Sequence, residues 1–136
     1  MKTQISTAAL LVAFAFVAGP VAAQIDWQPF AEEDVVEIFT DDEDGERRET
    51  KVWVVVLDDK GYIRTNDSRW LANIRRGSPV TLRVGANEMT VAVAENEDPR
   101  VYDRVEEAFK TKYGFMQRVM STFRISTPTV LELTHP

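Results

Sequence analysis

The apolar run at 52–57 is the strongest signal in the hydropathy pattern, because no polar residue interrupts it on either face. Such a run predicts a central strand whose two faces are both covered. Residues 58–61 are turn formers, among which Gly61 is expected to take a positive φ. Residues 62–65 then alternate, which predicts a second strand paired with the first.

A short helix is predicted directly after the second strand. Its apolar side is formed by Trp70, Leu71 and Ile74. Asn66 or Asp67 is expected to cap the helix start by accepting a bond from a free backbone N–H group. Gly77 stands where a left-handed residue ends a helix. The segment from 52 to 77 therefore predicts a strand, a tight turn, a strand and a helix.

Weaker alternation at 35–40 predicts a further strand ahead of the acidic turn at 41–46. Within that turn, Asp44 and Gly45 are typical of a type I′ hairpin, which needs a positive φ at both central positions. The preceding residues, 25–33, are expected to form an irregular lead-in.

The later chain predicts a hairpin and an amphipathic helix. Residues 80–84 and 89–93 alternate apolar and polar on either side of a turn. Asp98 and Pro99 are suited to the N-cap and first position of the helix, and Gly114 to its end.

A second short helix is predicted at 115–123, and a closing strand after Pro128. The order is then three strands, a helix, two strands, one or two helices and a strand. Antiparallel hairpins with one interposed helix favour an α+β fold, a small closed or split antiparallel barrel with helices packed outside.

The first residues have the pattern of a cleavable signal peptide at 1–23. Lys2 precedes an apolar run at 8–18, a Gly-Pro pair ends the run, and small residues lead to a cleavage site after Ala23. The run is shorter than the roughly 20 residues that cross a bilayer. We expect a periplasmic or secreted protein with one mature domain at 24–136; an uncleaved membrane anchor is the alternative.

Composition narrows the chemistry. The 136 residues carry a net charge of −6, no cysteine and one histidine. An acidic domain repels nucleic acid and anionic lipid, so we expect neither a nucleic-acid partner nor membrane association after signal cleavage. The missing cysteines exclude disulfides, thiol catalysis and thiolate metal sites, and the lone His135 excludes a Ser-His-Asp triad and histidine-rich zinc sites. Chemistry carried by a cofactor remains, as does binding without chemistry.

The predicted start of the helix near Trp70 is flanked by hydroxyl and cationic side chains, namely Arg64, Thr65, Ser68 and Arg69. Free N–H groups at a helix start suit an anion, and phosphate above all. The alternative is that Asp67 satisfies the helix start and that the two arginines are solvated. Nearby, Trp53, Tyr62 and Trp70 are suited to stacking on a planar ring, and core packing is the alternative for the two tryptophans.

The segment from Gly61 to Glu95, followed by a helix and a final strand, resembles the split β-barrel flavoproteins. That group includes the pyridoxamine-phosphate-oxidase-like proteins and the deazaflavin-dependent nitroreductases. The chain is more similar still to a small bacterial domain family of unknown function within the group. The similarity covers residues 53–134. It implies a split antiparallel β-barrel of the FMN-binding-like type, a homodimer, and FMN or deazaflavin as cofactor.

In the oxidase-like proteins a turn of the form T-N-x-x-S-R-K binds the flavin phosphate. This chain has a turn one residue shorter, in which Trp70 replaces the lysine. Thr65, Ser68 and Arg69 match this motif, and Lys51 and Arg64 lie where such folds often place cationic residues facing the cofactor. Taken together with the aromatic candidates, the predicted cofactor-binding residues are Lys51, Trp53, Arg64, Thr65, Asn66, Ser68, Arg69 and Trp70.

Two hypotheses of function follow. The first is an exported protein that binds a phosphorylated flavin-type cofactor and acts as an oxidoreductase, with the cofactor supplying the redox chemistry. The second is a non-enzymatic small-ligand-binding or interaction module that has lost the cofactor. A haem-binding split barrel is a third idea, but His135 is badly placed as an axial ligand.

Overall fold

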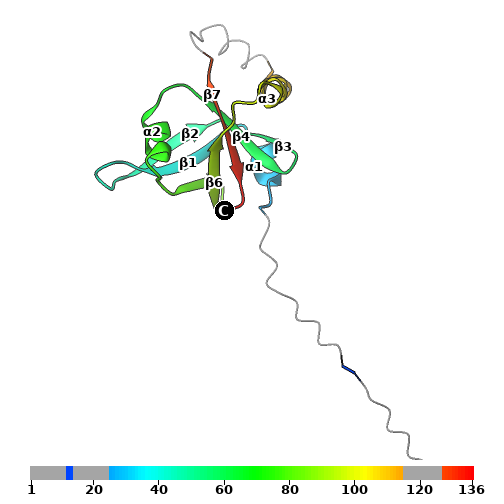
Figure 1. Ribbon diagram of the computed structural model, residues 1–136, viewed down its shortest axis with the longest axis horizontal. Helices are drawn as coiled ribbons and strands as arrows, with labels where there is room; N and C mark the ends of the chain where they lie inside the picture. The colour runs from blue at the N-terminus through cyan, green and yellow to red at the C-terminus, as the bar shows by residue number, and fades with distance from the viewer. Residues whose placement is uncertain (1–11, 14–24, 115–126) are drawn as a thin grey trace, which may run out of the picture.

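The computed structural model describes residues 12–13, 25–114 and 127–136. Within them, seven strands form one antiparallel sheet in the order β2-β1-β5-β6-β7-β4-β3, with three helices around it (Figure 1). The predicted signal peptide, apart from Val12 and Ala13, and the predicted helix at 115–123 lie outside the described residues.

The described elements follow the predicted order except that a helix is added near the start and that four strands, not three, precede the helix at 69–75. They are α1 (Gln28–Glu32), β1 (Val36–Asp41), β2 (Arg47–Val52), β3 (Val55–Leu57), β4 (Lys60–Thr65), α2 (Arg69–Arg75), β5 (Val80–Val84), β6 (Asn87–Glu95), α3 (Pro99–Tyr113) and β7 (Thr129–Thr134). The predicted hairpin at 80–84 and 89–93 is confirmed by the pairing of β5 with β6.

The main core lies inside the curled sheet. Ile38, Ile63, Leu82 and Leu131 are fully buried there, and Leu71 of α2 packs on the same cluster. These residues come from five elements, so the core depends on alternation in each strand. The predicted apolar side of α2 is confirmed.

A second, smaller core lies on the outer face of the sheet, where α3 covers β3, β4 and β7. Val55, Tyr62 and Val130 meet Val105 and Phe109 of α3 there. Neighbouring residues of a strand face opposite sides, so Ile63 of β4 enters the main core while Tyr62 turns toward α3. Figure 1 shows α3 beside β4 and β7, and α2 on the far side of the sheet.

The prediction of one central strand at 52–57 is wrong. The run is divided between β2 and β3, and these are the two edge strands of the sheet. At the break, the N–H of Val54 donates to the Tyr113 hydroxyl at 3.1 Å, and its carbonyl accepts from Lys112 Nζ at 2.7 Å. Side chains of α3 thus replace the ladder partners of Val54. The run is apolar throughout because the main core covers one face of β3 and α3 the other.

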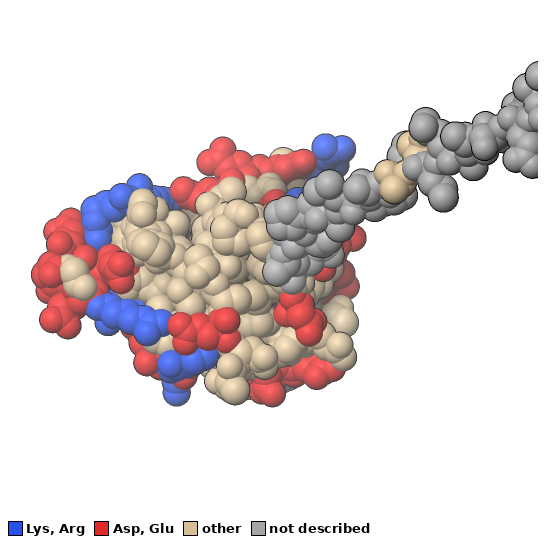
Figure 2. Space-filling view, turned by 90° about the horizontal axis from the view of Figure 1, so that it is seen from below, with Lys and Arg blue, Asp and Glu red and all other residues tan. Residues whose placement is uncertain are grey.

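The turns also differ from the prediction. The hairpin between β1 and β2 exists, and Figure 2 shows its acidic residues gathered at one end of the molecule. Only Gly45 has a positive φ there, at 84°, so the turn is not type I′. Positive φ at two successive positions occurs instead at Asp58 and Asp59, between β3 and β4. Gly61 is not in the left-handed region; it is needed because the Trp27 ring lies against it.

Helix ends account for further differences. The expected irregular lead-in contains α1, which places Trp27 and Phe30 in the main core. Ser68, not Asn66 or Asp67, caps α2 by accepting a bond from the N–H of Leu71. The Asp98 cap of α3 and the left-handed Gly77 after α2 are confirmed.

Candidate functional site

The predicted phosphate-binding corner lies between the end of β4 and the start of α2. The Thr65 hydroxyl donates to the carbonyl of Asn66 at 2.8 Å, and its oxygen lies 3.3 Å from the Ser68 Oγ. Ser68 Oγ also accepts the capping bond of α2. The two hydroxyls therefore stabilise the turn itself, while Asn66, Asp67 and Arg69 are the exposed side chains at its surface.

Arg69 differs from the other arginines of the described residues, each of which forms an ion pair with a carboxylate. Arg69 forms none within the described parts of the chain. A guanidinium carries five N–H donors in a planar fork that matches the oxygens of a phosphate or carboxylate. This exposed cation at the helix start is therefore available to an anion.

Arg64 is turned toward α3. Its side chain is 5% exposed, its Nη1 lies 2.6 Å from Glu106 Oε1, and its guanidinium carbon lies 3.8 Å from the centre of the Phe109 ring. These contacts neutralise the charge and cover the planar face of the guanidinium. The structure does not offer Arg64 and Arg69 as a pair for one phosphate, because Arg64 already has partners under α3.

The aromatic candidates lie in two different places. The Trp53 ring is half-buried and stacks on Tyr113, with 4.2 Å between ring centres and 7° between planes. Burial raises the pKa of Tyr113 to about 12, so its hydroxyl stays protonated and holds the break at Val54. Trp70 belongs to the main core, as in the core-packing alternative.

Lys51 is exposed on β2, and its backbone pairs with Glu37 of β1. The structure thus brings Thr65, Asn66, Ser68 and Arg69 together, and it places Lys51, Trp53 and Arg64 elsewhere. None of these positions tests ligand binding, so the cofactor roles of all eight candidates stay predictions.

A buried polar network next to the corner was missed by the sequence analysis. Asn73 of α2 is 1% exposed, and its Nδ2 donates to Thr40 Oγ1 at 3.1 Å and to Asp42 Oδ1 at 2.7 Å. Hydrogen bonds from Arg48 first, and then from Asn73, lower the pKa of Asp42 to about 2, with a smaller effect of the Arg69 charge. The available signal was the position of Asn73, three residues after Trp70 on the buried side of the helix.

Among the described residues, no group of three or more histidine, cysteine, aspartate or glutamate side chains is placed to hold a metal ion. The same residues include no helix that is long and apolar enough to span a bilayer.

Residues 26–133 match the family DUF2255, described as "Uncharacterized protein conserved in bacteria". The chain belongs to this family. The match covers nearly all of the expected mature domain, and the chain matches no curated protein.

Solved structures show which fold this DUF2255 domain has. HutZ, the haem storage protein from Vibrio cholerae, has a TM-score of 0.63 at 11% identity over 79% of this chain and 85% of its own. An F420-H2-dependent reductase, FDR-A, has a TM-score of 0.55 at 15% identity over 74% and 94%. A FAD-binding protein from Mesorhizobium loti has a TM-score of 0.56 at 9% identity over 79% and 84%. The domain is a split antiparallel β-barrel, which confirms the expected fold.

Proposed function

We propose that this DUF2255 domain binds a phosphorylated flavin-type cofactor, FMN or a deazaflavin, with its phosphate against the corner at 65–69. The single observation that carries the proposal is the exposed Arg69, which alone among the described arginines has no carboxylate partner. Such a cation at the start of α2, in a fold shared with flavin-type proteins, favours a phosphorylated ligand.

The residues at the corner fit the phosphate half of the cofactor. Arg69 would bind two phosphate oxygens through its fork of N–H donors, and the Asn66 amide is exposed beside it. The Ser68 hydroxyl accepts the capping bond and lies 3.3 Å from the Thr65 hydroxyl, so it would have to exchange that contact for one to a phosphate oxygen. Trp53 lies outside the corner, where its half-buried ring stacks on Tyr113, so it would contribute to the ring half of the cofactor and not to the phosphate half.

When bound, the cofactor would supply the hydride or electron transfer of an oxidoreductase. The protein would bind and orient it. We further propose that the domain acts outside the cytoplasm after cleavage behind Ala23, and that two copies form a homodimer. Mass measurement of the protein from its exported compartment tests both: a chain beginning at Gln24 and a native mass of two chains are expected.

The ligand is tested by comparing FMN with riboflavin, which lacks the phosphate, using tryptophan fluorescence. Binding of FMN should be at least about tenfold tighter than binding of riboflavin, since a phosphate–arginine contact is charge-assisted. Arg69→Met should remove this difference. Arg75→Met is the matched control, because Arg75 lies on the same helix but is already paired with Glu95. Equal affinities for FMN and riboflavin, or equal losses in the two variants, would contradict the phosphate assignment.

The contacts that Arg64 makes with α3 favour a second candidate function. Because Glu106 and Phe109 already hold Arg64, Arg69 is the one arginine of the described residues that is left for a phosphate at this corner, and Trp70 in the core replaces the lysine of the oxidase-like turn. The domain would then be a non-enzymatic binding or interaction module without a cofactor. Tight binding of a redox cofactor in protein isolated from its exported compartment would decide against this candidate.

A further inference from the structure

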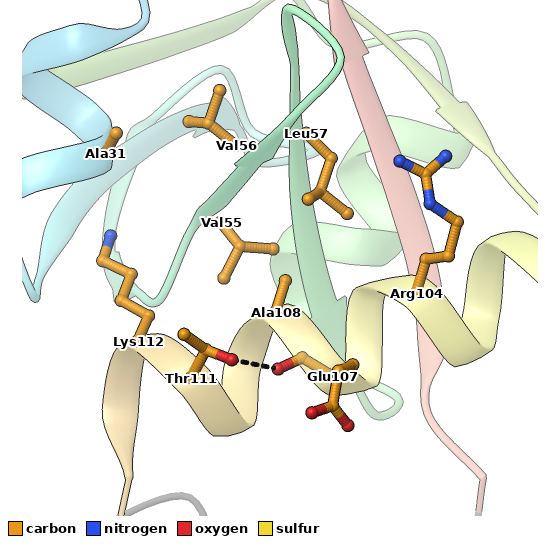
Figure 3. Close-up of a pocket in the computed structure, with 9 residues that line it drawn as sticks. All are labelled: Ala31, Val55, Val56, Leu57, Arg104, Glu107, Ala108, Thr111 and Lys112. Carbon is orange, nitrogen blue, oxygen red and sulfur yellow. Dashed lines mark hydrogen bonds between the residues drawn. The ribbon is translucent and has the colours of Figure 1, made fainter.

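A groove of about 510 Å³ runs between α1, the edge strand β3 and α3. Its walls are mostly apolar: Val55, Val56 and Leu57 line it from β3, Ala108 from α3 and Ala31 from α1 (Figure 3). Pockets that hold small molecules typically enclose about 300–1,000 Å³ and are mainly apolar, with a few placed polar groups. The groove has the size and the lining of a ligand site.

Lys112 stands at one end of the groove. Its Nζ donates to the carbonyl of Phe30 at 3.0 Å and to that of Val54 at 2.7 Å. It forms no ion pair with a carboxylate in the described parts of the chain; Asp34 and Glu33 influence it only at a distance. Burial lowers the pKa of Lys112, as expected for an ammonium that is partly withdrawn from water. Two of its three protons are used, and the third is available to an acceptor in the groove.

The other charged groups of the lining do not offer a second free cation. Arg104, at the opposite end, is paired with Asp58 at 2.7 Å. Figure 3 shows the carboxylate of Glu107 directed away from β3. Lys112 and Arg104 are eight residues apart on α3, which separates their Cα atoms by about 12 Å along the helix axis. The groove is thus apolar along its length and cationic at the Lys112 end.

We propose that this groove binds an anionic amphiphile, an aliphatic chain that ends in a carboxylate. The carboxylate accepts the third proton of Lys112, and the chain lies along Val55, Val56 and Leu57 against Ala108. Charge complementarity decides for an anion, because the one cation without a carboxylate partner in the lining is half-buried and its charge is costly to leave uncompensated. The site is independent of the corner at 65–69, since α2 lies on the other side of the molecule (Figure 1).

Octanoate and octanol test the proposal, because they share the chain and differ in charge. Calorimetric titration of the purified protein should give at least about tenfold tighter binding of octanoate than of octanol, as expected for a charge-assisted bond. Lys112→Met keeps the aliphatic stem and should remove this preference. Lys110→Met is the matched control, because Lys110 is exposed on the same helix and does not line the groove.

A second variant keeps the test decisive if Lys112→Met unfolds through loss of its bonds to Phe30 and Val54. Ala108→Phe fills the groove from α3 and should abolish binding of both probes, with the circular dichroism unchanged. Absence of octanoate binding to the wild-type protein overturns the proposal, as does octanol binding with equal affinity. A dimer that Ala108→Phe dissociates, without any octanoate binding, would identify the groove as a subunit interface and overturn it too.

Discussion

The ring of Trp27 lies directly against the backbone of Gly61. A Cβ atom built at Gly61 would stand 2.6 Å from Cζ3 and 2.8 Å from Cη2 of that ring. Trp27 precedes α1 and Gly61 is in β4, so this contact attaches the segment that begins at Ile25 to the barrel. Together with Phe30 it closes one end of the main core.

Gly61→Ala should therefore lower the free energy of unfolding by about 1–3 kcal/mol, the usual cost of overpacking a core. Chemical denaturation of the purified protein measures the loss. In the background Trp27→Ala the same substitution should be nearly neutral, because the clashing ring is gone. An equal loss in both backgrounds would show that the backbone at Gly61, and not Trp27, makes alanine unfavourable.

Asn73→Ala should lower the free energy of unfolding by about 1–3 kcal/mol. The substitution leaves the Thr40 hydroxyl, which is 1% exposed, without its hydrogen bond from Asn73, and a buried polar group is costly to leave unpaired. Asn66→Ala, at an exposed position ahead of the same helix, should change stability by less than about 0.5 kcal/mol. Similar unfolding midpoints for the two variants would mean that the hydrogen bonds of Asn73 do not stabilise the fold.

The ion pair of Asp42 and Arg48 should make stability depend on pH. The pKa of Asp42 is lowered to about 2 in the folded protein, from 3.8, chiefly by the Arg48 hydrogen bond. A lowered carboxyl pKa contributes stability that is present above the unfolded value and is lost as the pH falls through the folded one.

The stability advantage of the wild type over Asp42→Asn should accordingly shrink between about pH 4 and about pH 2. Urea unfolding across this range measures it. A constant difference between wild type and Asp42→Asn down to pH 2 would contradict the lowered pKa.

Glu106→Ala should cost about 3 kcal/mol of folding free energy. It removes the carboxylate that lies 2.6 Å from Nη1 of Arg64, whose side chain is 5% exposed, and the lower end of the range for broken buried pairs applies because Glu106 keeps 18% exposure. Glu107→Ala, one position along and exposed, should cost less than about 0.5 kcal/mol. Thermal or urea unfolding compares the two variants; equal stabilities would mean that the ion pair of Glu106 with Arg64 does not stabilise the fold.

The elements that were predicted correctly are those whose sequence signals lie within a few residues of one another. The pattern of β5 and β6, the Asp98 cap of α3 and the Gly77 end of α2 each need only residues within a few positions. The edge position of 52–57 could not be predicted, because both covers of β3 come from distant segments. Val54 packs in the main core, while Val55 meets Val105 and Phe109 of α3.

The candidate site, too, has a part that could be predicted from the sequence and a part that could not. Residues 65–69 form one turn, so their proximity follows from the sequence. The partner of Arg64 does not, since Glu106 is 42 residues away and only the packing of α3 on β4 brings the two together. Composition could not reveal that Arg69 lacks a carboxylate partner either, because the pairing of every other described arginine depends on the fold.

The central claim, that the domain binds a phosphorylated flavin-type cofactor, is tested most directly by the absorbance spectrum of the protein isolated without added cofactor. We expect the absorption band of a bound flavin or deazaflavin, released on denaturation as a phosphorylated compound. A colourless protein whose tryptophan emission does not change on addition of FMN or of a deazaflavin would contradict the account.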